Sequence, residues 1–297
     1  MKIIVTHTAP DMDAVTSVWL IKRFFPGWED AEVQFVPAGT RLAGAKPGPE
    51  IKEVIENIKG NEVIHVDTGM GPLDHHQTPD DNVCGASLTW DFVRENSNIF
   101  ADPRRSEKIV DKEKAISRMI QVVVDIDHFK EVYRKDALAD YQDFSIVGVL
   151  DGLKLFKPNS DSFYVEFLLT ALDGLLHDFE NKIWAETEIE EGKGFESRWG
   201  KGLGMETIND DVIKTAQLMG FAVVVRKDPR KGYVRIKANP KFGVDLTNTY
   251  EQLKKMDPEA TWFLHVSKKM LLNGTPKNPT MRPTKLSLDD IISVLKK

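Results

Sequence analysis

Short apolar runs alternate with helix-like segments through the first 70 residues, and this alternation limits the possible folds more than any other feature of the chain. The expected elements are, in order, a strand at Lys2–Thr6, a helix at Asp13–Phe25, a strand at Glu32–Pro37, a helix at Pro49–Ile58 and a strand at Glu62–Val66. Strands that alternate with helices predict an α/β sheet with parallel strands, and ligands of such sheets lie beyond the carboxyl ends of the strands. His7 and Asp67 follow two of these strands, so we expect both at that edge.

The rest of the chain predicts a second, smaller α/β domain. Further helices are expected at Ala86–Glu95, Glu107–Phe129, Tyr164–Glu188 and Leu286–Leu295, and further strands at Phe221–Arg226, Gly232–Ala238 and Thr261–Val266. Five glycines between Glu190 and Met205 favour an inter-domain connection near that stretch. We therefore expect an N-terminal domain with a parallel sheet (1–160), joined by a helix (161–190) to a smaller C-terminal α/β domain with a mixed sheet (191–297).

Charge is unevenly distributed along the chain. The formal net charge is −6, yet residues from Arg226 onward hold 16 Lys+Arg against 7 Asp+Glu, and the residues before it hold 24 against 39. An acidic body with a basic C-terminal part suits an enzyme whose metal ions neutralise its acids while the second part receives an anion. Two solvated surfaces that happen to differ are the alternative.

Cysteine content and hydropathy restrict the compartment. The single cysteine, Cys84, excludes an intramolecular disulfide and a cysteine-based zinc cluster, and it favours a reducing compartment. Nothing basic surrounds Cys84, so we expect a small buried residue rather than a nucleophile. The N-terminus lacks the apolar core of a signal peptide and no segment has a membrane-spanning length, so we expect a cytoplasmic protein without membrane contact.

The most informative motif is His7-x-x-x-Asp11-x-Asp13, which joins the first strand to the first helix. Divalent ions prefer carboxylate oxygens, and an imidazole beside them favours a transition ion such as manganese over calcium. The two carboxylates occupy alternate loop positions, so each can face a different ion. An aspartate that only caps the helix is the alternative interpretation.

A second acid and histidine cluster follows the third expected strand. Asp67, Asp74, His75 and His76 lie within ten residues, and His65 precedes them. A third segment offers Asp127, which ends an apolar helical stripe and would need a partner in the core, because a bare buried carboxylate is costly. Asp125, on another face, is the second choice, and pairing of Asp127 with an arginine is the alternative to metal binding.

These motifs resemble motifs one to three of the DHH phosphoesterase superfamily, over roughly residues 1–150. That superfamily includes RecJ-type exonucleases, oligoribonucleases, exopolyphosphatases and family II pyrophosphatases. Asp74-His75-His76-Gln77 and Trp262–Val266 with Asn273-Gly274 are also similar to the melanocyte-proliferating-gene protein family, whose members are linked to RNA exonuclease activity. The chain departs from that family in its first motif, and it lacks the Gly-Gly-Gly-His loop of many superfamily members.

The resemblance implies two divalent ions, manganese or magnesium, held by six residues with Asp67 bridging. One ion would be bound by His7, Asp11 and Asp67, and the other by Asp13, Asp67, His75 and Asp127. His76 would lie near the scissile phosphate as a donor or acid, and Asp74 would orient its neighbours. Such a pair activates water and clamps a phosphoryl group for in-line attack.

The basic C-terminal part offers candidates for substrate binding. They are Arg235 on an expected strand, His265 and Lys268 after another, and Asn273, Gly274 and Arg282 in the loop that follows. Backbone amides interleaved with basic side chains suit a phosphate or a nucleotide tail, whereas a solvated basic loop is the alternative.

The leading hypothesis is a metal-dependent hydrolase of phosphodiester bonds in short single-stranded RNA or DNA, or of a nucleotide or another small phosphoester. A pyrophosphatase or polyphosphatase, and a nucleotide-binding module without turnover, remain as alternatives. The sequence leaves the oligomeric state open.

Overall fold

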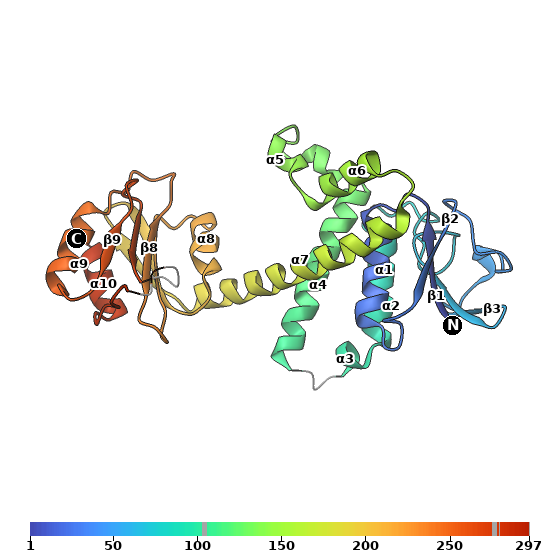
Figure 1. Cartoon of the computed structure of the whole chain (residues 1–297), viewed down its shortest axis with the longest axis horizontal. Helices are drawn as coiled ribbons and strands as arrows, with labels where there is room; N and C mark the ends of the chain where they lie inside the picture. The colour runs from blue at the N-terminus through green and yellow to red at the C-terminus, as the bar shows by residue number, and fades with distance from the viewer. Residues whose placement is uncertain (103–105, 275–277, 279, 297) are drawn as a thin grey trace. The chain divides into compact units, whose positions relative to one another are not determined.

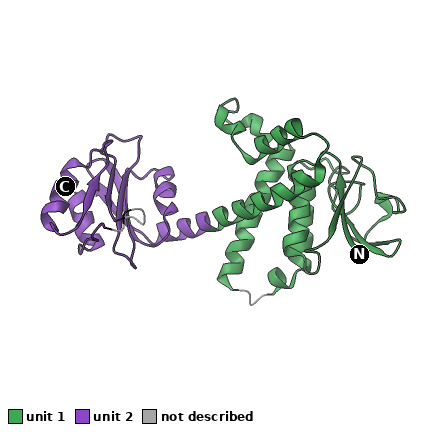
Figure 2. Ribbon diagram, viewed as in Figure 1, with its two compact units in different colours: residues 1–180 green, residues 181–297 purple. Residues whose placement is uncertain are grey.

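The computed structural model describes residues 1–102, 106–274, 278 and 280–296, which form two compact units (Figures 1 and 2). Unit 1 is Met1–Glu180 and unit 2 is Asn181–Lys297. Both are α/β, with a mostly parallel sheet in unit 1 and a mixed sheet in unit 2. The chain passes from one unit to the other within helix α7 (Asp161–Glu190), and the glycine-rich stretch before Met205 forms a strand pair instead.

The sheet of unit 1 has four strands in the order β2-β1-β4-β3. Their bounds are β1 Lys2–His7, β2 Glu32–Val36, β3 Glu56–Ile58 and β4 Asn61–His65. The central strand β1 runs parallel to both β2 and β4, so the carboxyl ends of the three strands lie at one edge. The sequence predicted these three strands, and their parallel pairing is confirmed.

The helix predicted at Pro49–Ile58 is wrong. Residues Gly48–Glu50 form a short 3-10 turn (η1), and the chain then enters β3, which pairs antiparallel with β4. Lys59 and Gly60 both adopt positive φ, 52° and 83°, which makes the two-residue turn of a β-hairpin. The apolar spacing resembled a helix, but pairing with β4 and burial of Ile58 on the sheet outweigh that local preference.

Helices of unit 1 pack together beside the sheet (Figure 1). Their bounds are α1 Met12–Phe24, α2 Gly85–Asn96, α3 Asn98–Ala101, α4 Glu107–Asp127, η2 Lys130–Tyr133, α5 Asp140–Asp143 and α6 Ile146–Phe156. Edge-to-face aromatic contacts of Trp19, Phe24, Trp90 and Phe100 join α1, α2 and α3. The Trp19 indole also donates to Asp173 of α7 at 2.8 Å, so α7 is tied to α1.

Unit 2 is a six-stranded sheet, in the order β5-β6-β7-β8-β10-β9, with helices on both faces (Figure 1). Its elements are β5 Lys193–Ser197, β6 Gly200–Glu206, α8 Asp211–Leu218, β7 Val223–Lys227, β8 Val234–Ala238, α9 Thr247–Met256, β9 Trp262–Leu264, β10 Met270–Asn273 and α10 Leu288–Leu295. Along β7, Val224 packs with α8, whereas Val223 and Val225 pack in the core that includes residues of α9 and α10. Only β6 and β7 are parallel, so the expected mixed sheet is confirmed.

Within the residues that the structure describes, no helix combines the length and apolarity needed to span a membrane.

Candidate metal centre

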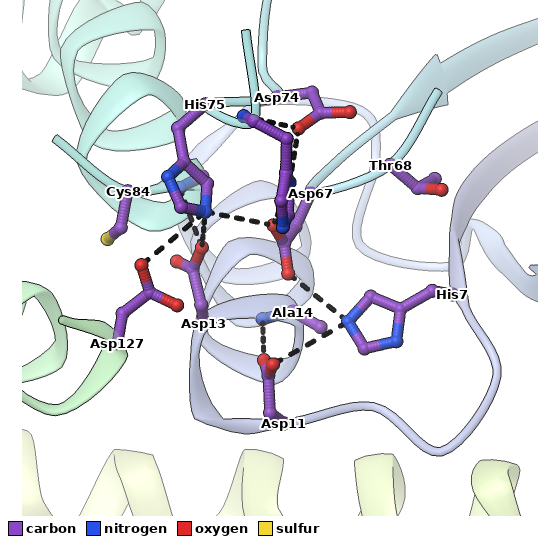
Figure 3. A network of polar contacts seen from close by, with 12 residues as sticks. His7, Asp11, Asp13, Ala14, Asp67, Thr68, Asp74, His75, Cys84 and Asp127 are labelled. Carbon is purple, nitrogen blue, oxygen red and sulfur yellow. Dashed lines mark hydrogen bonds and ion pairs between the residues drawn. The ribbon is translucent and has the colours of Figure 1, made fainter. Parts of the chain in front are cut away.

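Five segments meet at the carboxyl edge of the unit 1 sheet (Figure 3). They contribute His7 at the end of β1, Asp11 and Asp13 around the start of α1, Asp67 just after β4, the loop Asp74–His76, and Asp127 at the last turn of α4. The parallel pairing of β1 with β4 brings the first and third of these segments together, as the sequence predicted. All eight candidate metal-ligating and catalytic residues of unit 1 lie in or beside this cluster.

Asp67 is the centre of the arrangement because its two carboxylate oxygens face different partners. Oδ2 lies 3.2 Å from Nε2 of His7, whereas Oδ1 lies 3.7 Å from Nε2 of His75 and 3.8 Å from Nδ1 of His76. The residue adopts a left-handed conformation with φ 49°, which few side chains other than Gly, Asn and Asp tolerate. A carboxylate placed in this way has the geometry of a bridge between two cation sites.

His7 and Asp11 form the first group with Asp67. His7 donates through Nδ1 to the carbonyl oxygen of Thr8 at 2.9 Å, which leaves the Nε2 lone pair directed at the carboxylates. Asp11 accepts the Ala14 amide at 3.0 Å through Oδ1, and its Oδ2 lies 3.8 Å from His7 Nε2. Asp11 therefore caps α1 with one oxygen and faces His7 with the other, so the two interpretations from sequence are compatible.

His75 collects the second group of acids. Its Nε2 lies 3.4 Å from Oδ2 of Asp127 and 3.7 Å from Oδ2 of Asp13. Asp125 points elsewhere, since it accepts a hydrogen bond from Gln121 at 3.1 Å and lies 3.9 Å from Lys130. Of the two aspartates weighed from sequence, only Asp127 thus joins the cluster.

Asp13 is also a structural anchor. Its two oxygens accept the backbone amides of Gly85 and Ala86, at 2.7 and 2.6 Å, which begin helix α2. A Cβ on Gly85 would lie 2.8 Å from Cβ of Asp67, so only glycine lets the start of α2 approach the site this closely. Sequence reasoning missed Gly85, because its role depends on contacts with two distant segments.

Asp74 and His76 adjoin the cluster in the manner expected of an orienting pair. Asp74 accepts the amides of Met70 and His76 and the Nδ1–H of His76, the last at 2.7 Å. Although burial raises the pKa of Asp74, these hydrogen bonds hold it below its ordinary value. The His76 side chain is exposed, so it is the candidate catalytic group most accessible to a substrate.

The pKa values of the buried aspartates indicate that the cluster lacks a balancing positive charge. Burial, followed by the charges of Asp11 and Asp74, raises the pKa of Asp67 to about 9. Burial also raises the pKa of Asp13 and of Asp127. Oδ1 of Asp67 and Nε2 of His75 are buried atoms without a hydrogen-bond partner among the described residues. Unpaired buried acids and imidazoles are costly, and divalent cations between them would remove that cost, so the donor set fits metal ions.

The possible metal-binding groups overlap at shared residues. Three sets have ligand atoms within 4.8 Å of one another: His7, Asp11 and Asp67; Asp67, His75 and His76; and His75, Asp127 and His128. His128 is an addition to the sequence-based set. Its Nε2 lies 3.7 Å from Asp127 and donates to the carbonyl oxygen of Val83 at 2.9 Å, so it ties the end of α4 to the segment before α2.

One residue of the second sequence cluster has its partners outside the site, whereas Cys84 lies beside Asp13. His65 accepts the Leu42 amide and lies 3.3 Å from Glu56, and burial lowers its pKa to about 3. Cys84 is buried as expected, and burial together with Asp13 raises the pKa of its thiol, which argues against a nucleophilic role.

Arg41 supports the loop that carries Asp67, and sequence reasoning missed it. Its guanidinium group is nearly buried, donates to the carbonyl oxygen of Gly69 at 3.1 Å and forms an ion pair with Glu56. A Cβ on Gly69 would lie 2.4 Å from the Arg41 side chain, so glycine at φ 78° lets the loop fold tightly over the arginine. An isolated arginine after a strand carries no sequence signal of this role.

The candidate substrate-binding side chains of unit 2 have partners within that unit. Three of them form ion pairs: Arg235 with Asp210 at 2.7 Å, Lys268 with Asp245 at 3.3 Å and Arg282 with Glu259 at 3.1 Å. His265 is hydrogen-bonded to Ser267 at 2.8 Å. These four side chains lie at the surface or partly exposed, yet each is engaged by a neighbour.

Asn273 and Gly274 have structural roles that differ from the expected ligand contacts. The Asn273 amide group is fully buried, donates to the carbonyl oxygens of Thr261 and Arg282, and accepts the Thr284 amide. Gly274 has φ 85°, and a Cβ there would lie 2.0 Å from the Tyr233 ring. Asn273 therefore ties the end of β10 to Thr261, Arg282 and Thr284, and its side chain is not available to a substrate.

Comparisons with known proteins add little to this geometry. No family model and no curated protein matches the chain. Two solved structures are similar over almost its whole length. One is an uncharacterized protein from Helicobacter pylori G27, with 12% identity, TM-score 0.24 and coverage of 100% of this chain and 99% of that one. The other is the DHH domain of a member of the s1p family of ribosomal proteins, with 10% identity, TM-score 0.32 and coverage of 99% and 85%. These TM-scores are too low for either likeness to carry a conclusion about this chain.

Proposed function

We propose that the chain is a metal-dependent phosphoester hydrolase with a two-ion centre at the carboxyl edge of the unit 1 sheet. One observation carries the proposal. Oδ2 of Asp67 faces His7, and Oδ1 faces His75. Oδ1 of Asp67 and Nε2 of His75 are both buried, and neither has a hydrogen-bond partner among the described residues. Two bound divalent ions would supply an activated water nucleophile and electrostatic stabilisation of the phosphoryl oxygens. The resemblance of the three motifs to the DHH phosphoesterases supports the same reaction class.

The residues of the site have distinct tasks in this proposal. His7, Asp11 and Asp67 would hold one ion, and Asp13, Asp67, His75 and Asp127 the other. Asp13 would do so while both its oxygens accept the first amides of α2, which keeps the carboxylate in one orientation. The rigid placement of the donors lowers the reorganisation needed on binding.

His76 would assist the substrate rather than bind an ion. Asp74 accepts its Nδ1–H at 2.7 Å, which fixes the tautomer with the lone pair on Nε2 in the neutral ring. With Nδ1–H held in this way, His76 would accept a proton at Nε2 or donate one to a departing oxygen. The exposure of this side chain is consistent with access to a bulky substrate.

For the substrate we propose a short single-stranded nucleic acid or a nucleotide, with manganese as the preferred ion and magnesium as the second choice. The similarity of Asp74–Gln77 to the melanocyte-proliferating-gene proteins and the basic character of the chain from Arg226 onward support this choice. The imidazoles of the donor set favour manganese over calcium. Four side chains of unit 2 remain candidates for phosphate contacts: Arg235, His265, Lys268 and Arg282. Each would give up its present partner in order to bind a phosphate.

Release of mononucleotides from a short single-stranded RNA tests the proposal. The protein is incubated with manganese, with magnesium or with a chelator, and pyrophosphate is supplied in a parallel reaction. Metal-dependent cleavage of RNA that Asp67→Asn abolishes is the expected result. Cleavage of pyrophosphate alone would replace the substrate with an inorganic one. Tight metal binding without hydrolysis of RNA or pyrophosphate would support a nucleotide-binding module without turnover.

A further inference from the structure

Unit 1 exposes an unusual number of large apolar side chains around helices α5 and α6, which Figure 1 shows next to each other. Between residues 133 and 156, five such side chains are more than four-fifths exposed: Tyr133 84%, Leu138 100%, Phe144 94%, Leu155 86% and Phe156 85%. Only Leu150 of α6 is buried. Monomeric proteins rarely expose apolar groups so densely, so this surface, which we call the α5–α6 face, marks an interaction site.

The exposed side of α6 is shaped for close contact with another backbone. Val149, Gly152 and Phe156 follow one another at spacings of three and four residues, so they share one side of the helix. A Cβ on Gly152 would meet no atom within 4 Å. Glycine in a helix interior costs about 1 kcal/mol relative to alanine, and close approach of a partner at this position offers a reason to keep it.

A hollow of about 370 Å³ lies beside the projecting side chains. Val122, Ile126, Tyr141 and Ile146 line it together with charged groups. One of these, Glu131, has a buried Oε2 atom without a hydrogen-bond partner among the described residues. Apolar projections beside a hollow of mixed apolar and charged lining are features with which a surface can complement a copy of itself.

Charge on the α5–α6 face selects among possible occupants. Residues 129–160 hold five Lys+Arg and five Asp+Glu, whereas the rest of Met1–Glu180 holds 14 against 26, a balance of −12. A lipid surface or a nucleic acid would favour a net positive face, which this segment lacks. A second copy presents the same segment with equal numbers of acids and bases, so no net charge on the face repels it.

We infer that the α5–α6 face is the interface of a symmetric homodimer of this chain. The aromatic side chains of Tyr133, Phe144 and Phe156 bury roughly 450–750 Å² when fully covered, at roughly 150–250 Å² each. With Leu138, Leu155 and the hollow, this area reaches the roughly 800 Å² per partner that a stable complex needs. None of the five most exposed apolar side chains of the face is a candidate metal ligand, so the inference does not depend on the proposed function.

Sedimentation equilibrium of the full chain, from about 1 to 100 µM, tests the inference, because the dimer fraction depends on concentration. The expected mass is twice 33.6 kDa for the parent protein. Leu155→Glu combined with Phe156→Glu places two charges in the interface and should weaken association at least ~30-fold. Both side chains are exposed, so the variant should fold, as circular dichroism and unchanged metal-dependent hydrolysis would verify.

Leu218→Glu is the matched control, since Leu218 is 79% exposed but belongs to unit 2, and this variant should remain dimeric. A monomeric parent protein at the highest concentration would overturn the inference, as would a dimer that the double variant leaves intact. Pelleting of a monomeric parent protein with phosphatidylcholine/phosphatidylglycerol vesicles, lost in the double variant, would instead assign the face to a lipid surface.

Discussion

Unit 2 supplies hydrogen-bond donors to its buried Asp257, whereas unit 1 places its buried Asp13 and Asp67 close to each other. In unit 2, Asp257 accepts the Lys285 amide and the Thr284 hydroxyl at 2.8 Å each, and these bonds hold its pKa below the ordinary value. In unit 1, burial and neighbouring acids raise the pKa of Asp13 and Asp67, although Asp13 accepts two amides. A fold that supplies donors to one buried acid and places others against one another is prepared for a cation from outside.

The same contrast holds for buried basic groups. Arg226 in unit 2 has Asp210 at 3.1 Å and Asp228 at 3.5 Å, so its charge is balanced within the unit. His75 in unit 1 faces three acids, at 3.4 to 3.7 Å, none of which forms a hydrogen bond with it. Unit 2 therefore pairs this buried cation with its own acids, whereas Nε2 of His75 in unit 1 has no hydrogen-bond partner among the described residues.

The largest expected effect is that of Asp67→Asn. Removal of the bridging charge should reduce metal-dependent hydrolysis on the order of 10³-fold, comparable to the loss of a main electrostatic stabiliser. In chelator, the same variant should melt at least about 2 °C higher than the parent protein. The reason is that it no longer buries an acid beside other acids. Asp125→Asn, outside the cluster, is the control and should change neither property. A variant that melts lower in chelator would contradict the electrostatic interpretation.

Asp257→Ala tests the opposite side of the comparison. The change leaves the Lys285 amide and the Thr284 hydroxyl without their acceptor, so unit 2 should lose about 2–4 kcal/mol of stability. Hydrogen exchange followed by mass spectrometry over Trp262–Asn273 separates this loss from unit 1. Asp257→Asn keeps one acceptor oxygen and should lose less. Equal losses for both variants would show that packing, not hydrogen bonding, is affected.

Replacement of Arg41 should have a moderate effect on metal binding. Arg41→Met keeps an apolar side chain against Gly69. It loses the hydrogen bond to the carbonyl oxygen of Gly69 and the ion pair with Glu56, so the loop that carries Asp67 is held in place less firmly. We expect manganese affinity, measured by titration calorimetry, to fall about 10–100-fold, as for other groups that orient ligands. Arg41→Lys should recover part of it. Arg23→Met, which breaks the ion pair with Asp173, should leave the affinity unchanged.

The smallest effect is a pH dependence of unit 1 in chelator. The pKa of Asp67 is raised to about 9, so the folded metal-free unit keeps a proton that the unfolded chain has released. Binding of this proton contributes its full stabilisation of the folded unit at pH values below the ordinary aspartate pKa. That contribution is lost as the pH rises toward 9. Between pH 7 and 8, unit 1 should lose up to about 1.4 kcal/mol per pH unit from this group.

Asp67→Asn should reduce this pH dependence to the part that Asp13 and Asp127 contribute, and excess manganese should reverse it, since metal binding displaces the proton. Thermal melts in chelator and in manganese at several pH values provide the measurement. A parent protein whose chelated melting temperature rises between pH 7 and 8 would contradict the raised pKa of Asp67.

Much of the site was predictable because it follows from local chain order. A residue that directly follows a strand of a parallel sheet must lie at its carboxyl edge, which places His7 and Asp67 without any knowledge of packing. The apolar stripe of α4 likewise directs Asp127, not Asp125, toward the core. The error at Pro49–Ile58 arose because β3 exists only through its pairing with β4 and the turn at Lys59 and Gly60.

The sequence by itself determined which side chains meet at the sheet edge and that their chemistry suits divalent cations. Only the tertiary structure decided that Asp67 turns its two oxygens to different histidines, and that Asp13 holds the start of α2 through Gly85. It also decided that Asn273 ties β10 to neighbouring segments and that Arg235, Lys268 and Arg282 form ion pairs. Residue type and spacing set the available donors, but segments far apart in the chain set the direction in which each donor points.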